Sequence, residues 1–344
     1  MERRSLIVLL TIAATAIAAA LVFVAMRDTT STDAATATST AALQSTTAAT
    51  PDTTSPFAET TSTIPTDTTA PPDTLPPGAT ACDPYTTITA AGAVANPELV
   101  EASGMAASRT RPGVLWSHND SRDGARVYAI GADGADLGGF DIAGALAFDW
   151  EDMAAGPGSD PTTSMLYLGD IGDNFSIRDG RITVYRVPEP DPASLAGSIE
   201  GSVALEYTYP DGVYNAEAMF VSDGAVFIAT KDQKDARIYR GDATGDGSSI
   251  ETLELVAVLS LGAEVTAADV SWDGTTIVFR GYRTVWMWHR PPGGTVADAL
   301  ATEPCQAPSP EEVQGESIAF LADGTYATVS EGSNPNLFLI ARDS

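Results

Sequence analysis

Basic residues are scarce in this chain. Its 344 residues include 18 Lys and Arg against 46 Asp and Glu, and Lys231 and Lys234 are the only lysines. Leaving out residues 1–80 gives 15 basic and 39 acidic residues, a formal charge of about −24 for the remainder. A surface this acidic repels phosphate backbones, so the composition argues against nucleic-acid binding. Cations are the natural counterparts of such a surface.

Complete catalytic signatures are also missing. The sequence contains no G-x-S-x-G elbow, P-loop, H-E-x-x-H or C-x-x-C motif. His118 and His289 are the only histidines. His118 is a candidate general base because it ends a predicted strand, although a histidine without a partner is usually structural.

Cysteine is rare, with only Cys82 and Cys305. Cys82 lies at the start of the region in which strand patterns recur, and Cys305 lies just before the last of these repeats. Two cysteines in an exported chain predict one disulfide between them, and two free buried thiols are the alternative.

The N-terminal quarter differs from the rest. After Arg3 and Arg4, residues 5–26 form an uncharged apolar run that is long enough to span a bilayer. We expect residues 1–27 to be a transmembrane signal-anchor at the cell membrane, with everything after it extracellular. A cleaved signal peptide and a secreted protein are the alternative. Residues 28–80 are rich in Thr, Ser, Ala and Pro and predict a disordered stalk.

From Cys82 onward, short apolar runs with strand character recur between turn signals. The repeats begin at Ser103, Glu151, Glu217, Ala268 and Glu316, so their starts differ by 48, 66, 51 and 48 residues. Most first runs lead into a tight turn, such as Asp223-Gly224, and Asp-Gly between apolar runs is a strong hairpin signal. Each repeat therefore resembles one blade of strands.

Five four-stranded repeats predict a single all-β domain, a β-propeller, over residues 82–344. The last repeat reaches Ser344 without a fourth strand, and the apolar segment 86–94 is expected to supply it and close the ring. The fourth strand of the fourth repeat is expected at 295–300. The 66-residue interval leaves six blades as the alternative to five, with the extra residues otherwise forming a long outer loop.

Several motifs resemble those of exported actinobacterial propeller proteins without an assigned activity. They are Trp150-Glu151-Asp152, Gly169-Asp170-Ile171-Gly172-Asp173-Asn174, Val184-Tyr185-Arg186-Val187-Pro188-Glu189-Pro190 and Gly315-Glu316-Ser317-Ile318-Ala319. The likeness covers about residues 82–344. The chain is more distantly similar to phytase-like and gluconolactonase-type propellers, which implies the fold and a calcium-binding habit but no particular catalytic residue.

In a propeller blade, the first strand begins on the face where the antiparallel second strand ends. The repeats therefore predict a binding face on which leading residues meet the ends of second strands. The expected neighbours are Ser103 with His118, Asn119 and Asp120; Glu151 and Asp152 with Asp170 and Asp173; Glu217 with Lys231; Asp269 with Arg280 and Arg283; and Glu316 with Glu331.

Some of these groups are charge-matched and others are not. Two salt bridges are predicted, between Glu217 and Lys231 and between Asp269 and Arg280. The remaining acids have no basic partner that the sequence makes obvious, and like charges ~4 Å apart repel by roughly 4 kcal/mol at an effective dielectric of 20. Because their ligand atoms are all oxygens, a calcium site is expected. Its candidate ligands are Glu151, Asp152, Asp170, Asp173, Asn174, Glu316 and Glu331, and the alternative is that these acids lie on separate solvated loops.

Two functions remain open at this stage. The first is an extracytoplasmic, cell-envelope module that binds an unknown small molecule or envelope partner, is stabilised by calcium and touches the membrane only through its N-terminal helix. The second is a calcium-dependent hydrolase of phosphate esters or lactones, in which bound cations supply the positive charge that the chain lacks.

Overall fold

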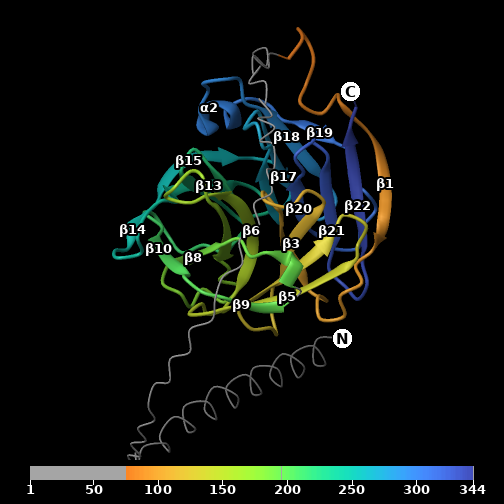
Figure 1. Cartoon of the computed structure of the whole chain (residues 1–344). Coiled ribbons are helices and arrows are strands. Elements are labelled where there is room, and N and C mark those ends of the chain that lie inside the picture. Colours follow the sequence, from red (N-terminus) through yellow and green to blue (C-terminus); the bar gives the residue numbers. More distant parts are fainter. Residues whose placement is uncertain (1–74, 195, 344) are drawn as a thin grey trace, which may run out of the picture. The chain divides into compact units, whose positions relative to one another are not determined.

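Five β-sheets are arranged in a ring around one axis (Figure 1), in the computed structural model, which describes residues 75–194 and 196–343. The first two blades each have five strands. Blade 1 contains β2 (Ala102–Ala107), β3 (Val114–Asn119), β4 (Arg126–Gly131), β5 (Asp136–Ile142) and β9 (Ala196–Ile199). Blade 2 contains β6 (Trp150–Pro157), β7 (Ser164–Asp170), β8 (Arg181–Pro188), β10 (Val203–Thr208) and β14 (Glu251–Thr252).

The other three blades each have four strands. Blade 3 contains β11 (Ala216–Ser222), β12 (Ala225–Thr230), β13 (Ala236–Asp242) and β15 (Glu254–Leu259). Blade 4 contains β16 (Ala267–Val270), β17 (Thr276–Arg280), β18 (Val285–His289) and β19 (Cys305–Ala307). Blade 5 contains β20 (Gly315–Phe320), β21 (Tyr326–Ser330), β22 (Asn336–Arg342) and β1 (Tyr85–Ala93). The predicted five-bladed propeller is confirmed.

The core consists of apolar layers between neighbouring blades. One layer packs Trp116 of blade 1 against Leu168 of blade 2, and equivalent layers join each later pair. The fifth layer packs Tyr128 of blade 1 against Ala327 of blade 5. Each inner strand lies between two such layers, so almost all of its residues are buried, including the polar residues near its start.

The ring closes through its N-terminal strand, as the sequence predicted. β1 pairs antiparallel with β22 from Tyr85–Arg342 to Ala93–Asn336 and forms the outer edge of blade 5. Just before β1, Cys82 forms a disulfide with Cys305, the first residue of β19 in blade 4. The expected disulfide is therefore present, and it ties the closing segment to the neighbouring blade.

The 66-residue interval does not contain a sixth blade. After β8 the chain passes through the 3-10 helix η1 (Pro192–Ser194) and adds β9 in parallel to β5 at the outer edge of blade 1. It then returns to blade 2 as β10, which pairs with β8. The extra residues thus form an excursion between two neighbouring blades.

The predicted fourth strand at 295–300 is wrong, because Val296–Leu300 forms the helix α2. Thr295 and Asp298 form a capping box, in which the Thr295 side chain accepts from the Asp298 backbone N–H and the Asp298 carboxylate accepts from that of Thr295. This local signal overrides the apolar pattern. The fourth strand of blade 4 is the three-residue β19 instead.

The predicted membrane anchor and almost all of the predicted stalk lie outside the described residues. Among residues 75–194 and 196–343, no helix is long and apolar enough to cross a membrane.

Candidate functional site

The inner strands of blades 2, 3 and 5 each contain a β-bulge near the start. In each case one residue is skipped in the pairing register, and these residues are Glu151, Glu217 and Glu316. A bulge re-aims its extra side chain, and bulges are common next to functional sites. Blade 4 pairs β16 with β17 without such a shift. Three glutamates are thereby presented on one face of the ring.

Residues at the ends of the second strands surround these glutamates. Lys231, which follows β12, places its Nζ 2.6 Å from Glu217 Oε2, so the predicted salt bridge is present. Glu331 follows β21, and Gln314 Nε2 donates both to Glu331 Oε2 at 2.7 Å and to Glu316 Oε1 at 2.9 Å. Gln314 therefore links the two acids of blade 5.

We use the term channel mouth for this group, which comprises Asp120, Asp149, Glu151, Glu217, Glu316, Glu331 and Lys231. Burial, together with the nearby charges of Asp149 and Glu217, raises the pKa of Asp120 to about 7. Burial and then the charges of Glu217 and Asp120 raise the pKa of Glu151 well above its usual range. These shifts indicate that the acids act on one another across blades.

The Glu316–Glu331 pair has a testable pH dependence. Burial and the hydrogen bond with Glu331 raise the pKa of Glu316 from 4.5 to about 8. Since the folded state holds this proton more tightly than the unfolded chain, the resulting stability is present below pH 4.5 and is lost as pH rises through 8. Glu316→Gln cannot ionise, so it should raise the melting temperature by about 4–8 °C at pH 8.5, equivalent to about 2 kcal/mol after solvent screening.

At pH 4.5 the same substitution should change the melting temperature little, because Glu316 is already protonated there. Circular dichroism melts at both pH values, with chelator and constant ionic strength, measure the difference. Glu254→Gln removes an exposed carboxylate and is the matched control. An equal effect of Glu316→Gln at both pH values would contradict the raised pKa of Glu316.

Asp170 and Asp173 have partners that the sequence did not reveal. Arg178 Nη1 lies 2.7 Å from Asp170 Oδ1, so the expectation that Asp170 has no basic partner is wrong. Asp173 accepts the backbone N–H groups of Ile177 and Arg178 at 2.7 and 3.1 Å. Asn174 is exposed and accepts from Asn215. These three side chains thus have partners of their own, and Asp170 adjoins the carboxylate cluster around Glu151 because its Oδ1 also accepts from the Asp149 N–H at 3.1 Å.

Asp152 lies deeper, where it joins three blades. Its Oδ1 accepts from the Met153 N–H, and its Oδ2 accepts from the N–H groups of Met219 at 2.7 Å and Ala268 at 3.0 Å. The residue has no exposed surface, and burial raises its pKa. These contacts make Asp152 a structural link between blades 2, 3 and 4.

The predicted pairing of Asp269 with Arg280 is wrong. Asp269 Oδ2 accepts from the Phe320 N–H at 2.7 Å. Arg280 points away, with Nη2 2.6 Å from Glu312 Oε2 and Nη1 2.9 Å from the Ser317 carbonyl. Without a bulge in β16, Asp269 is not turned toward the channel mouth. Arg283 is exposed and lines a separate surface groove.

His118 does not reach the surface of the channel mouth. Its ring is fully buried, packs edge-on against Trp150 with centroids 5.4 Å apart, and places Nδ1 3.1 Å from the Asn119 carbonyl. Burial lowers its pKa to about 4. Asn119 fixes the turn before β2 by accepting from the N–H groups of Val100 and Glu101. His118 is therefore a packed core residue, and not a base that a substrate can reach.

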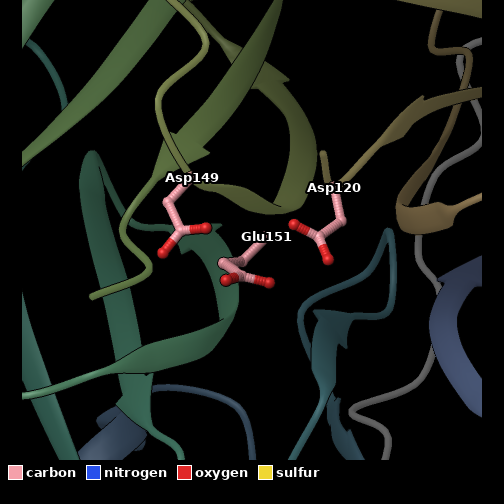
Figure 2. A group of neighbouring side chains, drawn as sticks. All are labelled: Asp120, Asp149 and Glu151. Atoms are coloured by element: carbon pink, nitrogen blue, oxygen red, sulfur yellow. The ribbon is translucent and has the colours of Figure 1, made fainter. Parts of the chain in front are cut away.

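Asp149 is a site residue that sequence reasoning missed. One carboxylate oxygen each from Asp120, Asp149 and Glu151 lies within 4.8 Å of the other two, and Figure 2 shows the three side chains facing one another. Strand alternation could not identify it, because Asp149 lies in the bend before β6 and Glu151 occupies the bulge of that strand.

Exposed apolar side chains lie beside the channel mouth on blade 2. Leu146, Phe148, Phe175 and Ile177 are 73, 60, 84 and 63% exposed. Leu146, Phe148 and Ile177 line a groove of about 530 Å³ together with Arg178 and Ile250, and we call it the blade-2 groove. Since apolar patches of this kind mark interaction sites, the groove extends the candidate surface outward from the acids.

Fold and site together define a five-bladed β-propeller with an acidic channel mouth. No protein-family model and no curated protein matches the chain. It is similar to a chain in "Crystal Structure of Mitotic Checkpoint Complex" (14% identity, TM-score 0.35, covering 70% of this chain and 61% of that one). It is also similar to "Structure of Dos1 propeller" (10% identity, TM-score 0.33, 68% and 58%). The chain thus spans about three fifths of both, and the fold assignment rests on the strand topology above.

Proposed function

We propose that the protein is an extracytoplasmic, cell-envelope β-propeller that binds a cationic ligand or partner at the channel mouth and is stabilised by calcium. One observation carries this proposal. Carboxylates from blades 1, 2 and 5 converge on one face, and among the described residues no Lys or Arg pairs with Asp120, Asp149, Glu151, Glu316 or Glu331. Such a face attracts positive charge and raises the rate of encounter with a basic partner.

The blade-2 groove supports a partner that has apolar as well as cationic groups. Phe148 lines the groove and directly precedes Asp149, and aromatic side chains are enriched at the centres of protein interfaces. A basic group in the channel mouth and an apolar side chain in the groove would be bound together. A basic, amphipathic segment of an envelope protein has this chemistry.

The proposed location outside the cytoplasm draws support from the disulfide. Cys82–Cys305 would persist in an oxidising compartment, where disulfides form and are kept. The apolar run at residues 5–26 is the expected means of export and anchoring.

Site-specific crosslinking in cells that produce the protein tests the binding role. A photo-reactive amino acid at Phe148 should yield a defined adduct that weakens as salt is raised, because the attraction is electrostatic. The same amino acid at Asp323, an exposed turn residue at the opposite ends of the strands, is the control. Adducts of equal yield at both positions, or none at Phe148, would contradict the proposal.

A further inference from the structure

Three carboxylates of the channel mouth come from two blades. Asp120 follows β3 of blade 1, while Asp149 precedes β6 and Glu151 occupies its bulge in blade 2. One oxygen from each lies within 4.8 Å of the other two (Figure 2). Two oxygens that bind one calcium ion at about 2.3–2.6 Å are at most about 4.6–5.2 Å apart, so three oxygens this close can share one ion.

The central residue of this cluster has an unsatisfied atom. Glu151 is 3% exposed, and its Oε1 is buried without a hydrogen-bond partner. A buried carboxylate oxygen without a donor is costly, so an uncompensated group of this kind requires a specific explanation. A cation would satisfy it.

The nearest basic side chains are engaged elsewhere. Lys231 pairs with Glu217, and Arg178 pairs with Asp170. Neither forms an ion pair with any of the three clustered carboxylates among the described residues. The charge of the cluster therefore lacks a counter-ion from these side chains.

The loop at Gly172 is shaped around two of these oxygens. A Cβ at this position would lie 2.2 Å from Glu151 Oε1 and 2.5 Å from Asp149 Oδ2. The Gly172 N–H also donates to the Asp149 carbonyl at 3.1 Å, which holds the loop against β6. A side chain at this position would displace both carboxylate groups, so glycine allows them to point toward the loop as they do here.

We propose that Asp120, Asp149 and Glu151 form a divalent-cation site for calcium that joins blades 1 and 2 at the channel mouth. All protein ligands are carboxylate oxygens, which favours a hard cation. Asp120 and Asp149 are half-buried, so water can complete the coordination from the open side. The inference rests on the proposed function and deepens its calcium component. Of the seven candidate ligands expected from the sequence it keeps Glu151, and it adds Asp120 and Asp149.

Calcium titration of the full-length, chelator-treated protein tests the site. Isothermal titration calorimetry with CaCl2 at pH 8 and constant, high ionic strength should show one site per chain, and MgCl2 should bind more weakly. At about 100-fold excess over Kd, calcium should raise the melting temperature by about 5–10 °C. The constant ionic strength separates binding from general screening of an acidic surface.

Matched neutral variants assign the ligands. Asp149→Asn and Glu151→Gln should each weaken calcium binding at least tenfold. Glu331→Gln removes the same charge from the channel mouth outside the cluster, and Asp170→Asn tests a candidate ligand that the sequence predicted and the cluster lacks. Both should stay within about threefold of the unaltered protein.

Two results would overturn the site: no heat and no melting shift with millimolar CaCl2, or a loss for Glu331→Gln or Asp170→Asn as large as that for Asp149→Asn. The unaltered protein decides the first outcome, so it does not depend on the folding of any variant. Calcium binding without crosslinking at Phe148 would support the ion site and reject the binding role. Crosslinking without calcium binding would support the binding role and reject the ion site.

Discussion

A chain that starts at Gly92 is expected to lose cooperative folding. The truncation removes most of β1, which supplies the paired edge of β22 from Arg342 to Asn336. It also removes Tyr85, which is 6% exposed, packs on Tyr326 with ring centroids 5.0 Å apart and donates its hydroxyl to the Gly324 carbonyl. An open apolar edge strand then becomes a template for aggregation.

Two control chains separate the causes of that loss. A chain starting at Leu75 keeps β1 and should melt like the full-length protein. Cys82→Ser with Cys305→Ser removes only the disulfide, and it should fold with a free energy of unfolding lower by about 2–4 kcal/mol. Far-ultraviolet circular dichroism and thermal melts compare all three. Cooperative melting of the chain from Gly92 at the temperature of the double cysteine variant would show that β1 does not close the ring.

Asp152→Ala is expected to lower the free energy of unfolding by about 3–5 kcal/mol, because buried N–H groups left without acceptors cost ~1–3 kcal/mol each. The substitution leaves the N–H groups of Met153, Met219 and Ala268 without the carboxylate that now accepts them. Since two of these donors belong to blades 3 and 4, the loss affects packing around the channel as well as within blade 2.

Urea unfolding of matched variants measures this effect. Asp152→Asn retains one acceptor oxygen and should cost about half as much. Asp141→Ala removes a carboxylate whose partner Arg126 is at the surface, and should cost at most about 1 kcal/mol. If Asp152→Ala proves no more destabilising than Asp141→Ala, the link between three blades is not important for stability.

The fold could be predicted because each blade carries local signals. Asp223 and Gly224 both adopt positive φ, at 51° and 72°, and they join β11 to β12 as the Asp-Gly pair predicted. The apolar segment 86–94 precedes the first repeat, and the last repeat lacked a fourth strand. The segment was therefore expected at the edge of blade 5. A strand was expected in place of α2, because the apolar pattern of residues 295–300 was given more weight than the capping box of Thr295 and Asp298.

The site could be predicted only in part, because its geometry depends on bulges. Glu151, Glu217 and Glu316 were expected on one face and lie there, but nothing local distinguished them from Asp269, whose strand lacks the bulge. Arg178 follows Asp170 by eight residues, and only the fold of the intervening loop brings the two together. Side chains that pair across loops and blades are far apart in the sequence, so an alignment of the repeats does not predict which of them will meet.

The position of the disulfide also determines how the ring bears mechanical load. Tension applied to the chain from its N-terminal side reaches Cys82 before Tyr85, the first residue of β1. The covalent bond to Cys305 diverts that tension into blade 4, so β1 is not peeled from β22 one residue pair at a time. In a tethered protein whose partner is pulled away, the closing strand would be shielded while the bond is oxidised. Reduction would expose it to the full force.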